Sequence, residues 1–160
     1  MIKGSTIFLR LALIGLGALV SIIVGAVLWT IYSNWNPELS GIDYVRWPTM
    51  LALTIAATAF YVACVQAWRL LGYADKNKPF SKDSVKALKR IQYAAFVVGG
   101  MLLVLMPWVY WAAQQDDAPG LVIIGTAFAM TPIVVGVFAG VLRRLIQNAL
   151  DLKSENDLTV

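Results

Sequence analysis

The residues best suited to chemistry in this sequence are basic side chains, and they gather between residues 72 and 90. On a helix, four of them would share one face at positions i, i+4, i+7 and i+8: Lys82, Lys86, Lys89 and Arg90. Ammonium and guanidinium groups bind carboxylates and phosphates. The segment therefore predicts either a docking surface for an acidic partner or a membrane anchor. As an anchor it would touch anionic lipid headgroups, at about 1 kcal/mol per base.

The groups that most enzymes use are scarce. The chain has no His, so it lacks the commonest general base, metal ligand and pH switch. The single Cys64 lies in an apolar stretch and has no partner for an internal disulfide. Asp116 and Asp117 are adjacent, but two carboxylates alone make a poor cation cage, and we expect them to cap the next helix. We therefore expect no enzyme activity, no metal and no cofactor.

The composition shows what kind of fold must position the basic residues. Of the 160 residues 59% are hydrophobic and only 14% are charged, and the mean hydropathy is +0.72. An average soluble domain is about 45–50% apolar and about 25% charged. A water-soluble fold of this size cannot bury such a surplus of apolar surface. The composition excludes an ordinary soluble enzyme, a disordered tail and a disulfide scaffold, and it favours a small membrane protein.

Four long uncharged runs separate the charged residues. Each can supply the ~20 residues that a helix needs to cross ~30 Å of hydrocarbon, where backbone groups must be satisfied within the segment. The expected spans are Leu11–Ile31, Thr49–Trp68, Ile91–Trp111 and Gly120–Leu142. The sequence therefore predicts an all-α fold, a single integral membrane bundle of four transmembrane helices, multi-pass in the cell membrane.

The basic residues also predict the orientation. Twelve of the thirteen Lys and Arg residues fall in the N-terminus, the second loop or the tail, and only Arg46 falls in an odd-numbered loop. Loops rich in Lys and Arg stay in the cytoplasm. We expect both termini inside, a cytoplasmic basic loop over residues 72–90 and a cytoplasmic tail over residues 143–160.

Small residues mark the expected helix-packing seams. Lipid tails are as apolar as Leu, so membrane helices associate where small residues let their backbones approach. The candidates recur at four-residue spacing in the first and fourth spans: Gly17, Ser21 and Gly25, and Gly136 and Gly140. We expect seams within one monomer; a homodimer seam is the alternative.

Two prolines interrupt the later spans. Pro107 and Pro132 each remove a backbone donor, so we expect kinks there. Pro132, beside Thr131, lies deeper in its span and could border an uncharged substrate path. No ionisable residue lies near the middle of any span, which counts against a proton-coupled transporter.

Two cytoplasmic helical extensions are expected. Ser81 is a good N-cap and Asp83 suits the first turn, so a helix from Lys82 should run into the third span. The fourth span keeps an apolar face past Leu142. Because the tail turns acidic and then apolar, we hypothesise that it packs back on the basic loop.

Five segments together form a recognisable pattern: Asp75–Ser81, Ser84–Lys89, Asp116–Gly120, Val137–Ala139 and, most specifically, Leu152–Val160. They resemble the bacterial membrane family catalogued as domain of unknown function 2975. The resemblance implies a four-helix inner-membrane protein with no established activity and no catalytic residues. Members resemble products often encoded beside a small helix-turn-helix regulator, which implies a membrane partner of a transcription factor.

The leading hypothesis is a regulatory or interaction protein whose cytoplasmic face binds a partner such as that regulator, without contacting nucleic acid itself. The candidate partner-binding residues are Lys76, Lys78, Lys82, Lys86, Lys89, Arg90, Glu155 and Asp157. The alternative is a small transporter or an immunity protein against membrane-active peptides.

Overall fold

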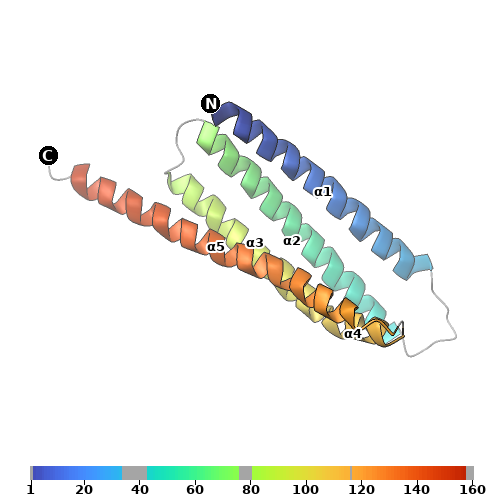
Figure 1. Ribbon diagram of the computed structural model, residues 1–160. Coiled ribbons are helices and arrows are strands. Elements are labelled where there is room, and N and C mark those ends of the chain that lie inside the picture. The colour runs from blue at the N-terminus through green and yellow to red at the C-terminus, as the bar shows by residue number, and fades with distance from the viewer. Residues whose placement is uncertain (1, 34–42, 76–80, 116, 158–160) are drawn as a thin grey trace.

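The protein is a bundle of long helices. The computed structural model describes residues 2–33, 43–75, 81–115 and 117–157 (Figure 1). Its elements are α1 (Ile2–Ser33), α2 (Asp43–Asp75), α3 (Lys82–Val104), α4 (Met106–Gln115) and α5 (Gly120–Asp157).

The predicted all-α membrane architecture is confirmed at the level of its elements. Within the described residues, four helical segments are long and apolar enough to cross a membrane, α3 and α4 counting together as one. They are Thr6–Ser33, Arg46–Asp75, Lys82–Gln115 and Gly120–Glu155. Each contains one expected span and extends past it, because charged residues at helix ends do not stop a helix that leaves the hydrocarbon.

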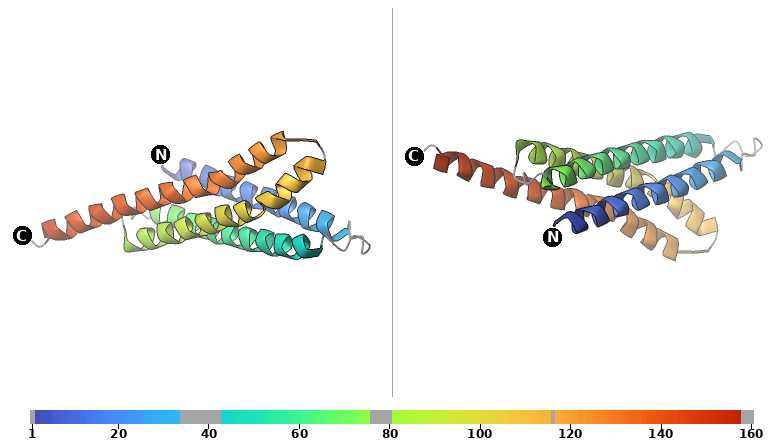
Figure 2. Two further views of the ribbon diagram at one scale, coloured as in Figure 1. Left: turned by 90° about the horizontal axis from the view of Figure 1, so that it is seen from below. Right: turned by 90° about the horizontal axis from the view of Figure 1, so that it is seen from above.

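The third span is broken rather than continuous. Leu105 separates α3 from α4, and the two helices run in different directions (Figure 2). The Leu105 N–H is shared between the carbonyls of Met101 and Leu102, both at 3.2 Å. Two residues later Pro107 has no N–H to donate, which favours a break here. The expected span Ile91–Trp111 therefore changes direction next to Pro107, as the predicted kink requires, and is divided into two helices at Leu105.

Pro132 behaves differently, because α5 continues through it without a break. The Thr131 hydroxyl donates to the Ala127 carbonyl at 3.0 Å, within the turn that Pro132 disturbs. A side-chain hydroxyl that bonds back to its own helix is a common arrangement in apolar surroundings.

The helices α1, α2, α3 and α5 form a row in that order, and α4 packs mainly against α5. The extensive contacts join α1 to α2, α2 to α3, α3 to α5 and α4 to α5 (Figures 1 and 2). The helix α3 therefore holds the row together. The helix α1 lies at one edge, and large side chains such as Phe8 and Ile22 are 73% and 69% exposed, as suits contact with lipid.

The antiparallel helices α3 and α5 approach each other closely along a seam that contains glycines. A Cβ at Gly136 would lie 3.1 Å from the Phe96 ring, and one at Gly140 would lie 3.0 Å from Cδ of Gln92. A Cβ at Gly99 would collide with Ile133 and lie 3.3 Å from the Ala129 carbonyl oxygen. Glycine suits these positions because a Cβ at Gly99 or Gly136 would also press against a backbone carbonyl of the facing helix, whereas one at Gly140 would displace only the Gln92 side chain.

The small residues at the same spacing in α1, which are Gly17, Ser21 and Gly25, do not bring two helix backbones close together. A Cβ at Gly17 or Gly25 would meet nothing within 4 Å, so neither glycine marks a close helix approach. Ser21 lies against α2 through its hydroxyl, which contacts that of Tyr61 and donates to the Gly17 carbonyl at 2.8 Å. The expected seam in α1 is thus a polar contact at Ser21.

These two environments give a matched test of the fold. Gly99→Leu should lower the free energy of unfolding by about 1–3 kcal/mol, because the new side chain overpacks the α3–α5 seam. Gly25→Leu makes the same chemical change in open space and should leave stability unchanged or slightly raised, since Leu is the better helix former. Thermal unfolding of the detergent-solubilised variants measures the difference, and equal stabilities would contradict the seam.

Candidate functional site

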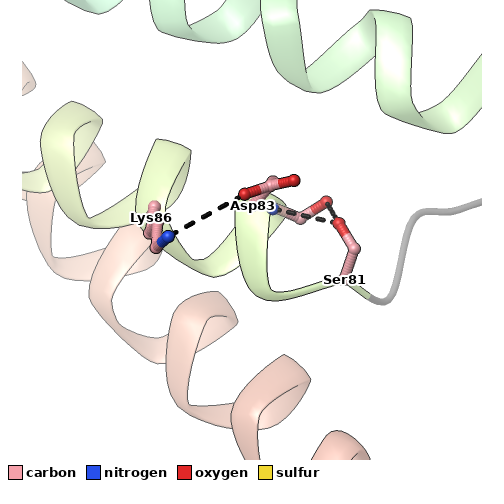
Figure 3. A network of polar contacts seen from close by, with 4 residues as sticks. Ser81, Asp83 and Lys86 are labelled. Carbon is pink, nitrogen blue, oxygen red and sulfur yellow. Dashed lines mark hydrogen bonds and ion pairs between the residues drawn. The ribbon is translucent and has the colours of Figure 1, made fainter.

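The candidate site lies at the end of the bundle where α2 ends, α3 begins and α5 extends outward. Ser81 caps α3 with extended backbone angles (φ −138°, ψ 156°), and its hydroxyl accepts the Ser84 N–H at 3.2 Å. The two hydroxyls are 2.9 Å apart, and Ser84 is fully buried (Figure 3). The predicted start of α3 is thus present, and it is a firmly capped helix end.

The first turns of α3 present an exposed basic face, here called the α3 basic face, made of Lys82, Lys86, Lys89 and Arg90. The buried residues of these turns lie on the opposite side of the helix; they are Ser84, Ala87 and Leu88. Asp83 offsets little of the charge, because its carboxylate is 4.0 Å from the Lys86 ammonium and both side chains are exposed (Figure 3). The structure therefore brings these four predicted residues together on one accessible surface.

A small apolar cluster fixes this face relative to α5. Leu88 of α3 and Ile146 of α5 are 3% and 8% exposed and belong to one buried cluster. Leu70 of α2 and Leu150 of α5 pack against the same cluster. Three helices are thereby held together beside the basic residues.

The tail does not turn back within the described residues, contrary to the hypothesis. The helix α5 runs on to Asp157 and projects past the first turn of α3 (Figure 1). Its 38 residues span about 57 Å, well beyond the ~30 Å of hydrocarbon. Asp151 and Glu155 are exposed on this extension, which is a straight arm beside the α3 basic face.

Three predicted partner-binding residues are not located by the structure. Lys76 and Lys78 lie outside the described residues, as does the side chain of Asp157.

A contact between α1 and α2 at the same end was missed by sequence reasoning. The Arg10 guanidinium donates to the Asp75 carboxylate at 2.8 Å and lies 5.3 Å from the centre of the Trp68 ring. The Arg10 and Asp75 side chains are 34% and 30% exposed, so their ion pair adds modestly to stability. The partners are 65 positions apart, and no local signal in the sequence connects them.

The hydroxyls that a transport path could use are engaged within their own helices. Thr54 donates to the Met50 carbonyl at 2.7 Å, and Thr126 donates to the Val122 carbonyl at 2.8 Å. Thr58 and Thr131 bond in the same way. These contacts do not favour the transporter alternative.

The cap of α3 can be tested directly. Ser81→Ala should cost about 1 kcal/mol of stability, because the Ser84 N–H loses its acceptor at a helix N-terminus. Ser154→Ala removes an exposed hydroxyl that bonds only within α5 and should change stability by less than about 0.5 kcal/mol. Chemical or thermal unfolding compares the two variants, and an unaffected Ser81→Ala protein would contradict the capping role.

Comparisons with known proteins agree with this architecture. The model of the family described as protein of unknown function (DUF2975) matches residues 30–160. The uncharacterized membrane protein YoaS of Bacillus subtilis (strain 168) is 43% identical over 161 residues, covering 98% of both chains. No solved structure matches. With most of its length matched and four candidate spans, this chain belongs to the DUF2975 family and is a multi-pass membrane protein.

Proposed function

We propose that the end of the bundle bearing the α3 basic face lies in the cytoplasm, with both termini on that side. The cations at this end whose side chains the structure describes come from all four spans: Arg10, Arg69, Lys82, Lys86, Lys89, Arg90, Arg143, Arg144 and Lys153. The opposite end has only Arg46. The positive-inside rule supports this orientation.

The function that the geometry supports best is regulation through a cytoplasmic partner. The observation that carries this proposal is the pairing of an exposed basic helix face with a helical arm that projects past the start of α3. Leu152 on the arm is 68% exposed, so an apolar side chain is accessible next to the charged residues. A partner with an acidic patch and a small apolar contact would fit both features.

A small helix-turn-helix regulator is the partner that the family resemblance suggests. Binding at this surface would hold the regulator at the membrane and away from DNA. The protein itself would contact no nucleic acid and would act as a binding protein rather than as an enzyme. The absence of His from the sequence supports that distinction.

The partner is tested by reversing charge on the α3 basic face. The variant Lys82→Glu with Lys86→Glu should reduce capture of a co-expressed helix-turn-helix regulator at least about tenfold, because two attractive contacts become repulsive. The matched control, Lys82→Arg with Lys86→Arg, retains the charge and should capture as the wild type does. Pull-down from detergent extracts measures both, and undiminished capture by the Glu variant would contradict the proposal.

A further inference from the structure

Arg143 occupies an unusual place for a cation, because it lies on the side of α5 that packs against α3. It comes three residues after Gly140, whose backbone approaches Gln92, and three residues before the buried Ile146. Residues three or four apart share a helix face. Arg143 is accordingly half-buried, whereas the next residue, Arg144, is exposed.

The guanidinium of Arg143 has one buried nitrogen without a hydrogen-bond partner in the part of the chain that the structure describes. This nitrogen is Nε. Arg10 makes an instructive comparison, because its Nε is also unpartnered but another of its nitrogens pairs with Asp75. A buried charged donor left without an acceptor is costly, so an acceptor from outside the chain would be stabilising at Arg143.

The register of the α3–α5 seam brings a second cation to the same level. Successive contacts pair Gly99 with Ile133, Phe96 with Gly136 and Gln92 with Gly140. One turn further, the antiparallel register places Lys89 level with Arg143. The Lys89 ammonium is 6.0 Å from the centre of the Tyr93 ring on its own helix.

The carboxylates of the described residues nearby are engaged elsewhere or lie farther along. Asp75 pairs with Arg10 at 2.8 Å, and Asp83 is 4.0 Å from Lys86. Asp151 lies two turns beyond Arg143 on α5. The part of the α3–α5 contact where Arg143 and Lys89 lie therefore carries more positive than negative charge.

The depth of this level fits a lipid phosphate. Arg143 directly follows the uncharged residues 118–142, which are long enough to cross the hydrocarbon. It therefore lies at the boundary between acyl chains and headgroups. Guanidinium presents a planar fork of donors that matches the oxygens of a phosphate.

We propose that Arg143 and Lys89 bind the phosphate of an anionic phospholipid where α3 and α5 leave the membrane. The lipid phosphate supplies the acceptor that Arg143 lacks and neutralises the two neighbouring cations. Bound there, it links the first turns of α3 to α5 and steadies the base of the projecting arm.

The test is lipid retention by the purified full-length chain, measured by native mass spectrometry with phosphatidylglycerol or phosphatidylcholine added. The wild type should retain phosphatidylglycerol in preference. Arg143→Gln should lower the retained fraction about tenfold, and the exposed Lys89→Gln should lower it severalfold, since each removes a charge-assisted contact. Arg144→Gln is the matched control and should change it less than twofold.

Three outcomes would overturn the proposal. If Arg144→Gln and Arg143→Gln lower retention equally, the lipid is held by general surface charge. If the wild type retains both lipids equally, no anionic site exists. If millimolar inorganic phosphate displaces the lipid, the site binds a free anion instead. Lys89→Gln alters only an exposed side chain, so its result stands even if Arg143→Gln misfolds. Arg143→Gln changes no residue of the α3 basic face, and the partner-capture variants change only Lys82 and Lys86, so the lipid site and the partner surface can fail independently.

Discussion

The close approach of α3 and α5 is the contact on which the rest of the structure depends. In lipid, apolar side chains gain little by leaving acyl chains for one another, so helices associate where their backbones can come near. Gly99, Gly136 and Gly140 permit that approach from both sides of the seam. The helix α3 also packs along α2, and α1 packs against α2. The positions of all the other helices therefore depend on the contact between α3 and α5.

The seam also determines what lies at the charged end. Its antiparallel register sets how far α5 projects past Ser81, and it turns Arg143 toward α3 rather than toward solvent. The buried cluster of Leu88, Ala139 and Ile146 continues the seam to the charged end of the bundle. The exposed α3 basic face and the arm of α5 are therefore held in a fixed relation, as a surface that recognises a partner needs to be.

Much of the fold could be predicted from charge and hydropathy, because a helix in hydrocarbon must be long, apolar and continuous. The N-cap at Ser81 was also predictable, since the signal is local. The environments of the glycines could not be predicted. Gly17 and Gly25 show the same kind of spacing as Gly136 and Gly140, but the spacing of small residues does not indicate which neighbouring helix, if any, they face. The break at Leu105 was expected only as a kink at Pro107. The pairing of Arg10 with Asp75 depends on tertiary register, which no short motif encodes.

The central claim is that the cationic end of the bundle lies in the cytoplasm, because the proposed partner surface can meet a cytoplasmic regulator only on that side. A dual reporter fused after Val160 tests this directly, combining a fluorescent protein active only inside the cell with a phosphatase active only outside. The account predicts fluorescence without phosphatase activity. Phosphatase activity without fluorescence would place the α3 basic face on the outer side and contradict the account.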